Sequence, residues 1–374
     1  MTLKEEFIKL GYTEEDYEII RNNHAIINIK EETLIKKLKD NFAFFLKNGY
    51  TKEEVIKMTK SLPSIYSLSI ENMKQKIEDM IALGYTKEEV IKMTKILPSI
   101  YSYSIESIKQ KIEDIIALGY TKEEVIKMTK SLPSIYGYSI ESIKQKIEDM
   151  VALGYTKEEV IKMTKSFPSI YGYSIESIKQ KIEDMIALGY TKEEVIKMTK
   201  SFPSIYSLSI ENMKQKMSDM IVLGYTKEEV IKMTKSFPPI YGLSTENMRQ
   251  KIKDMIALGY TKEEVIKMTK SFPPIYGLSI ENIKQKIEFY DSVSMHELAV
   301  INPKLLMQSV NLSYARYSFY KDRGIDIDIN NYRKLFIEQK RFEKEYGISK
   351  IELLEKYDYN KYKEEKEKEN GRII

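Results

Sequence analysis

A 35-residue unit recurs along the chain and constrains the fold more than any other feature of the sequence. The string Gly-Tyr-Thr-Lys-Glu-Glu begins at Gly49, Gly84, Gly119, Gly154, Gly189, Gly224 and Gly259. Seven regular copies therefore fill residues 49 to 293. A unit of this length cannot bury the apolar side of its own helices, so neighbouring copies must cover one another.

The first half of each unit predicts a short amphipathic helix. In the first copy, Thr51 followed by Glu54 forms the T-x-x-E capping box that starts a helix. The apolar side of this helix comprises Val55, Ile56, Met58, Thr59 and Leu62. Pro63 lacks an amide and disfavours helical dihedrals at the residue before it, so the helix ends there. Residues 63–66 are too few for another helix, and we expect a packed single turn of 3₁₀ type.

The second half predicts a longer helix. Ser69 is placed to cap its N-terminus, and Glu71 complements the positive end of the helix dipole. Helical spacing then joins the apolar residues Ile70, Met73, Ile77, Met80 and Ile81 into one stripe. Gly84 should end this helix in the left-handed conformation, with Tyr85 making the hydrophobic contact of a Schellman cap.

We therefore predict an all-α protein, an α-solenoid or superhelix of seven regular helix–turn–helix units. The ends should be imperfect copies, because terminal repeats face water. Residues 1–48 are expected to form a degenerate N-terminal capping repeat, and residues 49–293 the tandem repeats. Residues 294–360 should hold degenerate C-terminal repeats and a cap, and residues 361–374 a charged tail that frays.

Composition narrows the class of protein further. Lys and Arg number 60 against 56 Asp and Glu, so a nucleic-acid surface would require the charges to segregate. With no cysteine, disulfides and sulfur-bound zinc sites are excluded. The start of the chain has no apolar signal region or basic transit segment, and no apolar run is long enough to span a membrane. We expect a cytoplasmic monomer with no membrane partner.

Nothing in the sequence predicts an enzyme. Glu53 and Glu54 lie in a first helical turn, where carboxylates complement the dipole and need no catalytic explanation. His24 and His296 stand in the two eroded ends without a repeated partner. No Gly-rich phosphate loop occurs, and the recurrent glycine is a lone helix terminator. We expect no catalytic residue, metal or cofactor.

Stacking would turn each recurrent lysine of the first helix into a file of cations. One file comprises Lys57, Lys92, Lys127, Lys162, Lys197, Lys232 and Lys267. The other, about one turn away, comprises Lys60, Lys95, Lys130, Lys165, Lys200, Lys235 and Lys270. Such files can follow a phosphate backbone without reading bases. The alternative is that Glu53, four residues before Lys57, forms a surface i,i+4 pair that only keeps the helix soluble.

The second helix adds a weaker set of candidates. Lys76 shares a flank with Asn72 and Asp79, whereas Lys74 lies between two glutamates, so Lys76 is preferred. The equivalents of Lys76 are Lys111, Lys146, Lys181, Lys216, Lys251 and Lys286. The sixth repeat is the most basic, and its Arg249 offers a planar fork suited to phosphate or guanine.

Two other columns have plainer explanations. Tyr85, Tyr101, Tyr103 and their equivalents could stack on bases, but their places at caps and after a proline favour core packing. The exposed variation among repeats is almost confined to Asn or Ser at the third position of the second helix, which a capping role explains. No base-per-repeat code is visible, so recognition by shape and charge is expected.

The repeat resembles that of the mitochondrial transcription termination factor (mTERF) family. The clearest match runs from Leu153 to Met163 and continues with Phe167-Pro168-Ser169-Ile170. The resemblance implies a left-handed superhelix of three-helix units, two α-helices and a short 3₁₀ helix, whose concave basic groove binds nucleic acid. Family members act on duplex DNA or RNA in organelles. This chain departs from them in lacking a visible presequence and in the near identity of its repeats.

The prediction from sequence is therefore a nucleic-acid-binding solenoid. Duplex DNA is favoured over RNA, gripped through its phosphates, with a role in transcription regulation. The alternative is a protein-binding scaffold that uses the same surface. Lysine files free of carboxylate partners favour the first function, and a mixed or apolar groove favours the second.

Overall fold

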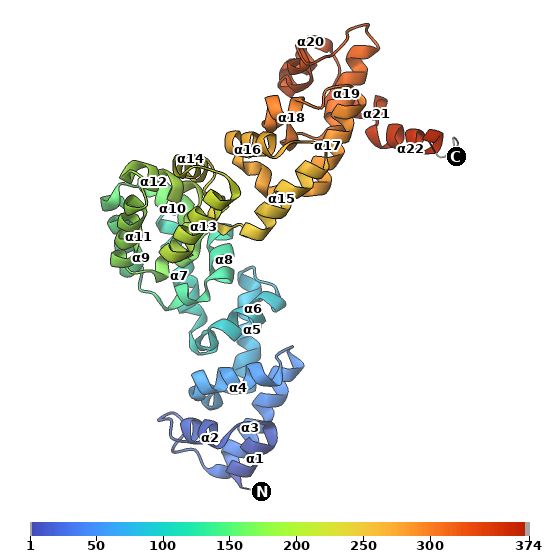
Figure 1. Cartoon of the computed structure of the whole chain (residues 1–374). Helices are drawn as coiled ribbons and strands as arrows, with labels where there is room; N and C mark the ends of the chain where they lie inside the picture. Colours follow the sequence, from blue (N-terminus) through green and yellow to red (C-terminus); the bar gives the residue numbers. More distant parts are fainter. Residues whose placement is uncertain (1, 371–374) are drawn as a thin grey trace. The chain divides into compact units, whose positions relative to one another are not determined.

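The computed structural model describes residues 2–370, and throughout that range the chain is helical and contains no strand (Figure 1). It forms two compact units. Unit 1 comprises the residues up to Glu183 together with Thr199–Tyr206. Unit 2 comprises Asp184–Met198 and the residues from Ser207 onward. Within each unit consecutive repeats stack on one another, so the α-solenoid architecture predicted from the sequence is confirmed.

Every regular repeat has the same three elements. The first helices, which we call helices A, are α4 (Lys52–Ser61), α6 (Lys87–Ile96), α8 (Lys122–Ser131), α10 (Lys157–Ser166), α12 (Lys192–Ser201), α14 (Lys227–Ser236) and α16 (Lys262–Ser271). The 3₁₀ turns are η1 (Pro63–Ser67), η2 (Pro98–Ser102), η3 (Pro133–Gly137), η4 (Pro168–Gly172), η5 (Pro203–Ser207), η6 (Pro238–Gly242) and η7 (Pro273–Gly277). The second helices, helices B, are α5 (Ile70–Leu83), α7 (Ile105–Ala117), α9 (Ile140–Leu153), α11 (Ile175–Ala187), α13 (Ile210–Leu223), α15 (Thr245–Ala257) and α17 (Ile280–Ser292).

The ends of these elements follow the predicted signals. Thr51 Oγ1 accepts a hydrogen bond from the Glu54 amide at 3.2 Å, and the Glu54 carboxylate accepts one from the Thr51 amide at 2.8 Å. Helix A ends at Ser61 with Leu62 as its C-cap, directly before Pro63, as expected. Gly84 closes helix B at φ 116°, in the left-handed region that favours glycine. Its neighbour Tyr85 donates its amide to the Met80 carbonyl, which completes the Schellman cap.

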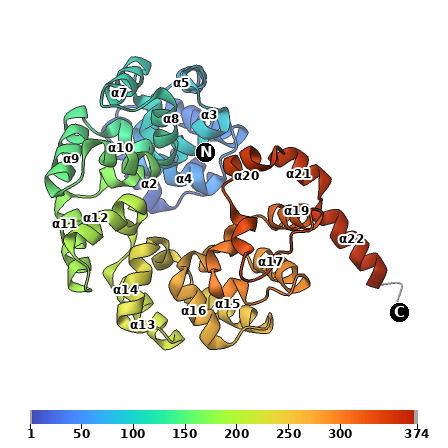
Figure 2. The ribbon, with the colours of Figure 1, turned by 90° about the horizontal axis from the view of Figure 1, so that it is seen from above.

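Helices A and helices B form two layers. In unit 1, α6, α8 and α10 pack side by side in one layer, and α5, α7 and α9 in the other. Figure 2 shows α8 and α10 on the inner side of the curve that this unit describes, with α7 and α9 on its outer side. The core lies between the layers and is built from the predicted stripes, including Val55, Met58, Ile77 and Met80. Ile81, placed in the stripe from the sequence, is 42% exposed at its edge.

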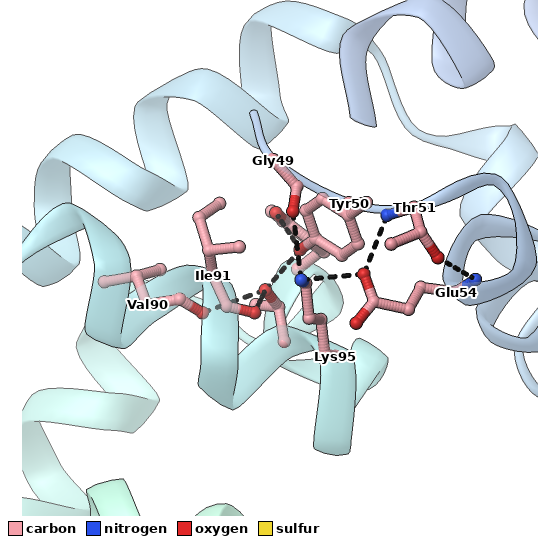
Figure 3. A network of polar contacts seen from close by, with 9 residues as sticks. Gly49, Tyr50, Thr51, Glu54, Val90, Ile91 and Lys95 are labelled. Carbon is pink, nitrogen blue, oxygen red and sulfur yellow. Dashed lines mark hydrogen bonds and ion pairs between the residues drawn. The ribbon is translucent and has the colours of Figure 1, made fainter. Parts of the chain in front are cut away.

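One polar network closes every interface between regular repeats. At the first interface the Tyr50 hydroxyl lies 2.5 Å from Thr94 Oγ1 and 3.1 Å from the Tyr101 hydroxyl, all buried (Figure 3). Thr94 donates its own hydrogen to the Val90 carbonyl, so it must accept from Tyr50, which in turn accepts from Tyr101. The later interfaces repeat this arrangement at Tyr85, Tyr120, Tyr155, Tyr190 and Tyr225. Buried polar groups need such partners, and these fix the register of the stack.

The two ends are imperfect copies, and they differ in how much they keep. At the N-terminus stand α1 (Leu3–Leu10), α2 (Glu14–Arg21) and α3 (Glu31–Lys47). Their Tyr12 reaches Thr59 and Tyr66, so the first interface matches the regular ones. The C-terminal elements are α18 (Leu298–Ile301), η8 (Pro303–Met307), α19 (Val310–Lys321), η9 (Tyr332–Phe336), α20 (Gln339–Tyr346), α21 (Lys350–Lys356) and α22 (Tyr359–Asn370). There the Tyr260 hydroxyl donates to the His296 carbonyl instead.

Most of the segment expected to fray at the C-terminus is helical. Helix α22 begins at Tyr359 and continues to Asn370, and it packs on α19. Tyr362 stacks on Tyr314 with 4.8 Å between the ring centroids. This aromatic contact holds a helix whose sequence is otherwise mostly charged. Residues 371–374 of the predicted tail lie outside the described residues.

Candidate nucleic-acid interface

Formal charge separates between the two layers. In each regular repeat helix A carries three lysines against two glutamates, Lys52, Lys57, Lys60, Glu53 and Glu54 in the first copy. Helix B of the first four repeats carries two lysines against three carboxylates, Lys74, Lys76, Glu71, Glu78 and Asp79 in the first copy. Each helix A thus contributes one net positive charge, and each of those helices B one net negative charge. The near-neutral chain therefore has a basic layer and an acidic layer.

The Lys60 file is paired with carboxylates along its whole length. Lys95 lies 2.7 Å from Glu54 of the preceding repeat and also donates to the Gly49 carbonyl at 3.0 Å (Figure 3). The pairs are Lys60–Asp16, Lys95–Glu54, Lys130–Glu89, Lys165–Glu124, Lys200–Glu159, Lys235–Glu194 and Lys270–Glu229. The hydrogen bond from Lys95 holds the pKa of Glu54 below its usual range. These lysines join consecutive repeats, and we leave them out of the proposed interface.

The Lys76 file is turned into the stack. The Lys76 ammonium donates to the Tyr103 carbonyl of the next repeat, and burial lowers its pKa. The same bond is made by Lys111 to Tyr138, Lys146 to Tyr173, Lys216 to Leu243, Lys251 to Leu278 and Lys286 to Leu306. Lys181 occupies the equivalent position and is half-buried. Lys76 lies three residues after Met73 and four before Met80, so its stem continues the apolar stripe. This file too is left out of the proposed interface.

The Lys57 file remains open to a ligand. Its members are exposed on the solvent face of helices A, and none of their side chains makes an ion pair or hydrogen bond to any of residues 2–370. Unit 1 holds Lys57, Lys92, Lys127 and Lys162, and unit 2 holds Lys197, Lys232 and Lys267. The predicted alternative partner, Glu53, is instead held by hydrogen bonds in its own helical turn, which lower its pKa. No ion pair therefore holds these cations, although the exposed glutamates equivalent to Glu53 lie on the same helices.

A second exposed file was not singled out from the sequence. Lys52, Lys87, Lys122, Lys157, Lys192, Lys227 and Lys262 occupy the first position of each helix A and are exposed. At the junction of the first two regular repeats, Lys87 and Lys92 of the two files line one hollow of about 410 Å³ with Lys47, Lys95 and the carboxylate residue Glu88. Lys47 stands where later repeats have a small apolar residue. Only the side-by-side packing of neighbouring repeats brings these four ammonium groups together.

Arg249 lies away from both files. It belongs to helix B of the sixth repeat and forms an ion pair with Glu246 one turn earlier. Its guanidinium is therefore in the helix-B layer and already shares its charge with a carboxylate. Arg249 and the Lys57 file therefore lie in different layers. We do not include Arg249 in the proposed interface.

The tyrosine columns and His296 have structural partners, whereas His24 is exposed. Tyr85 and Tyr101 are buried, which confirms core packing for both columns, and Tyr103 is half-buried. His296 Nδ1 lies 2.5 Å from Asp291 Oδ1, and its ring stacks on Tyr260 at 4.3 Å. No group of three His, Asp or Glu side chains able to hold a metal ion occurs among the described residues. In the same part of the chain, no helix is both long and apolar enough to cross a bilayer.

Comparison with known proteins identifies the repeat. A family model described as mTERF matches residues 4–152, 78–187, 115–223, 142–256 and 185–343. These overlapping matches together span nearly the whole chain. No curated protein matches it.

Proposed function

The chain belongs to the mTERF family of non-enzymatic, nucleic-acid-binding helical-repeat proteins, and on that premise we propose that it grips duplex DNA by its phosphates. The proposed contact surface is the exposed face of the helices A, with the Lys57 file as its main element. A part in transcription regulation follows from the same premise, and the chain is proposed to act as a monomer.

The observation that carries this proposal is the unpaired state of the Lys57 file. Helices that pack against one another stand about 8–10 Å apart, so a file of equivalent lysines presents one ammonium group at about that interval. Along one DNA strand a charge recurs about every 3.4 Å of the helix axis, so successive lysines can each meet a different phosphate. Lys52 and its equivalents would add contacts at the edge of the same layer.

The identity of the repeats argues for backbone recognition. All seven copies have the same sequence from the recurrent glycine to the second lysine of the A helix, so no position in the layer can read one base differently from the next. Contacts of this kind fix position on the nucleic acid and carry no sequence information. We therefore expect affinity that depends on salt and little on base sequence.

A duplex is favoured over a single strand for a separate reason. Proteins that hold single strands stack bases on exposed aromatic rings. Here the tyrosines beside the helix-A layer, such as Tyr50 and Tyr85, are buried in the inter-repeat networks. The layer therefore offers charge without stacking surfaces, which suits a duplex whose bases are covered.

A protein scaffold is the second candidate function. The Glu53 file runs beside the Lys57 file on the same helices, and both are exposed. A surface of alternating charges can bind a protein of complementary pattern. The experiment below separates the two, because a scaffold would not bind nucleic acid with a steep dependence on salt.

The test compares two sets of four substitutions in the same repeats. The first set changes the open file in unit 1: Lys57→Gln, Lys92→Gln, Lys127→Gln and Lys162→Gln. The matched control changes exposed lysines of helices B: Lys74→Gln, Lys109→Gln, Lys144→Gln and Lys179→Gln. Both sets remove four positive charges from exposed helical positions, so they differ only in the layer affected.

We expect the first set to weaken binding to labelled duplex DNA and the control set to leave it nearly unchanged. Each lost phosphate contact should reduce the log–log salt slope by about 0.9, hence by about 3.6 for four contacts. Titrations against single-stranded DNA and duplex RNA rank the targets. Equal weakening by both sets, or no binding at low salt, would overturn the proposal and favour the scaffold.

A further inference from the structure

The near identity of the repeats makes their few departures informative. Among the first six copies, the formal charge changes at one equivalent position of helix B, and it changes in two of the copies. The column reads Glu78, Glu113, Glu148, Glu183, Ser218 and Lys253. The two departures are in adjacent repeats, on α13 and α15, which pack against each other in unit 2.

These departures reverse the sign of the helix-B layer locally. Helix α13 carries two lysines and two carboxylates, so its net formal charge is zero. Helix α15 carries Arg249, Lys251 and Lys253 against Glu246 and Asp254, and its net charge is positive. The corresponding helices of the first four repeats each carry a net negative charge. Within unit 2 the helix-B layer is thus neutral at α13, basic at α15 and acidic at α17.

A hollow of about 280 Å³ lies at this region. Arg249, Ile252, Lys253 and Ile256 line it from one face of α15, because their spacing of three and four residues aligns them on a helix. Val222, from the last turn of α13, and Lys262, from the first turn of α16, complete the rim. We call the five residues Val222, Arg249, Lys253, Ile256 and Lys262 the α13–α15 patch.

The patch is apolar as well as basic. Val222 is 75% exposed and stands where the other regular repeats have alanine or serine. Ile256 also lines the hollow and is 41% exposed, as are its equivalents such as Ile81 and Ile186 to a similar degree, so Val222 is the residue particular to this repeat. A branched apolar side chain held in water is unfavourable unless something covers it, so this substitution is not explained by the stability of the stack.

The cations of the patch are largely available. Lys253 and Lys262 are exposed and form no ion pair or hydrogen bond with other described residues. Arg249 is paired with Glu246 on the solvent side. Two carboxylates lie nearby, and neither forms an ion pair with Lys253 or Lys262: Asp254 accepts from Gln250, and Asp219 accepts from Gln215 and Thr245.

We propose that the α13–α15 patch docks a protein segment in which an apolar side chain is flanked by carboxylates. The apolar side chain fills the hollow against Val222 and Ile256, and the carboxylates meet Lys253, Lys262 and Arg249 on its rim. The hollow is slightly smaller than the roughly 300–1,000 Å³ typical of small-molecule pockets, and a single side chain suits it. Duplex DNA presents phosphates but no apolar group of this kind, which favours a protein.

Four of the five patch residues belong to helices B, and Lys262 is the one that the patch shares with the edge of the helix-A surface proposed for DNA. A chain carrying the four Lys57-file substitutions should therefore keep full affinity for an acidic segment. Each proposal can fail without the other, because the variants that test them change different residues: the Lys57 file for DNA, and Ser218, Val222 and Lys253 for the peptide.

The test uses a short fluorescein-labelled peptide with one leucine between glutamates and aspartates, titrated with the full chain by fluorescence anisotropy. The key variant, Ser218→Glu with Lys253→Glu, restores the residues that the first four repeats carry at these positions. The restored glutamates are tolerated in those repeats, so the variant should keep its helical circular dichroism and melting temperature. We expect its affinity for the peptide to fall about tenfold or more.

The apolar contribution is tested separately. Val222→Ala should lower the affinity of the chain for the peptide by about fourfold for each methylene-sized group removed. A peptide with serine in place of leucine should lose affinity for the unchanged chain and respond little to Val222→Ala. An excess of duplex DNA serves as competitor, with the Lys57-file variant used to keep DNA off the other layer.

Grafting the patch provides the positive control. Ala117→Val with Glu148→Lys places the same residues three repeats earlier, beside Lys144 and Lys157, and should create a second peptide site per chain. The proposal is overturned if the peptide binds the Ser218→Glu/Lys253→Glu chain as well as the unchanged one. It is equally overturned if binding does not depend on the leucine, or if DNA displaces the peptide from the patch, which would make the region a phosphate site.

Discussion

At the scale of single residues, the same side-chain type plays three different parts in one repeat. Lys57 is exposed and unpaired, Lys95 is bonded to Glu54 of the preceding repeat, and Lys76 is buried against the Tyr103 carbonyl of the next. All three have an ordinary place on the surface of an isolated helix. Their roles differ because neighbouring repeats cover two of the three positions.

The inter-repeat hydroxyl network should contribute measurably to stability. Tyr50→Phe leaves the Tyr101 hydroxyl without an acceptor and Thr94 without a donor in a buried site. We expect a loss of about 1–3 kcal/mol in the free energy of unfolding, measured by urea denaturation. Tyr103→Phe is the control, because the one hydrogen bond of that half-buried hydroxyl within residues 2–370 is from Ser99 at 3.3 Å. A similar loss of unfolding free energy in both variants would show that the buried network contributes no more to stability than an ordinary surface hydroxyl.

At the scale of the element, helix A is both the most regular part of the repeat and the part that joins repeats. Its capping box fixes its start, and the carboxylate of that box also receives the lysine of the following repeat. The seven copies of helix A differ only at the last position, where the second copy has Ile96 and the others serine. Helix B varies more, and its departures produce the α13–α15 patch.

The lysine–glutamate pairs predict a dependence of stability on pH. The pKa values of Glu54, Glu89, Glu124, Glu159, Glu194 and Glu229 are lowered, in each case mainly by the lysine of the next repeat. A carboxyl group with a lowered native pKa stabilises the fold above its unfolded pKa and loses that contribution as pH falls through the native value. The melting temperature should therefore fall as pH is reduced below about 4.5.

The control for this prediction replaces Glu54, Glu89 and Glu124 by glutamine. Glutamine can keep the capping box but cannot titrate. This variant should be less stable at neutral pH, and its melting temperature should change less between neutral and acidic buffer. An acid dependence as steep as that of the unchanged chain would assign the effect to other carboxylates. Added salt should also reduce the difference, because the pairs are partly exposed.

At the scale of the whole molecule, the interfaces between regular repeats are interchangeable. Each uses the same tyrosine, threonine and lysine contacts, whichever two copies meet. In a solenoid, stability is approximately a sum over repeats and nearest-neighbour interfaces. One copy can therefore be removed without creating a new kind of contact.

Deletion of residues 119–153, one complete repeat, should leave a folded monomer. The new junction joins Leu118 to Gly154, where every other junction also has an apolar residue before glycine. Circular dichroism should show that the helical signal falls in proportion to the residues removed. Light scattering should show a single species. Binding to duplex DNA should lose about 0.9 from the salt slope, the share of one lysine. A deletion of half a repeat, residues 119–135, should fail to fold, and if both deletions behaved alike the modular account would be wrong.

Much of this protein is determined by the sequence alone. The spacing of Thr51, Glu54, Pro63 and Gly84 predicts where the helices begin and end, because capping, proline and left-handed glycine act within a few residues. The repeat itself predicts stacking, since the stripes of Val55 and Met73 require cover that only a neighbour can give. The solenoid and its core follow from these local rules.

The tertiary structure alone decided which cations remain open. The partner of Lys95 lies 41 residues away and that of Lys76 lies 27 residues away, so a helical wheel drawn for one repeat cannot show either contact. In the sequence, Lys57 was a candidate for phosphate contact like the other two lysines. In the folded stack, its side chain is the one left without a partner among the described residues. The same holds for the α13–α15 patch, where Val222 and Lys253 meet only because helices of adjacent repeats lie side by side. The charge and the apolar pattern of a helix are read from its own sequence. Whether a charge is paired or an apolar group is covered depends on distances that are set only in the folded stack.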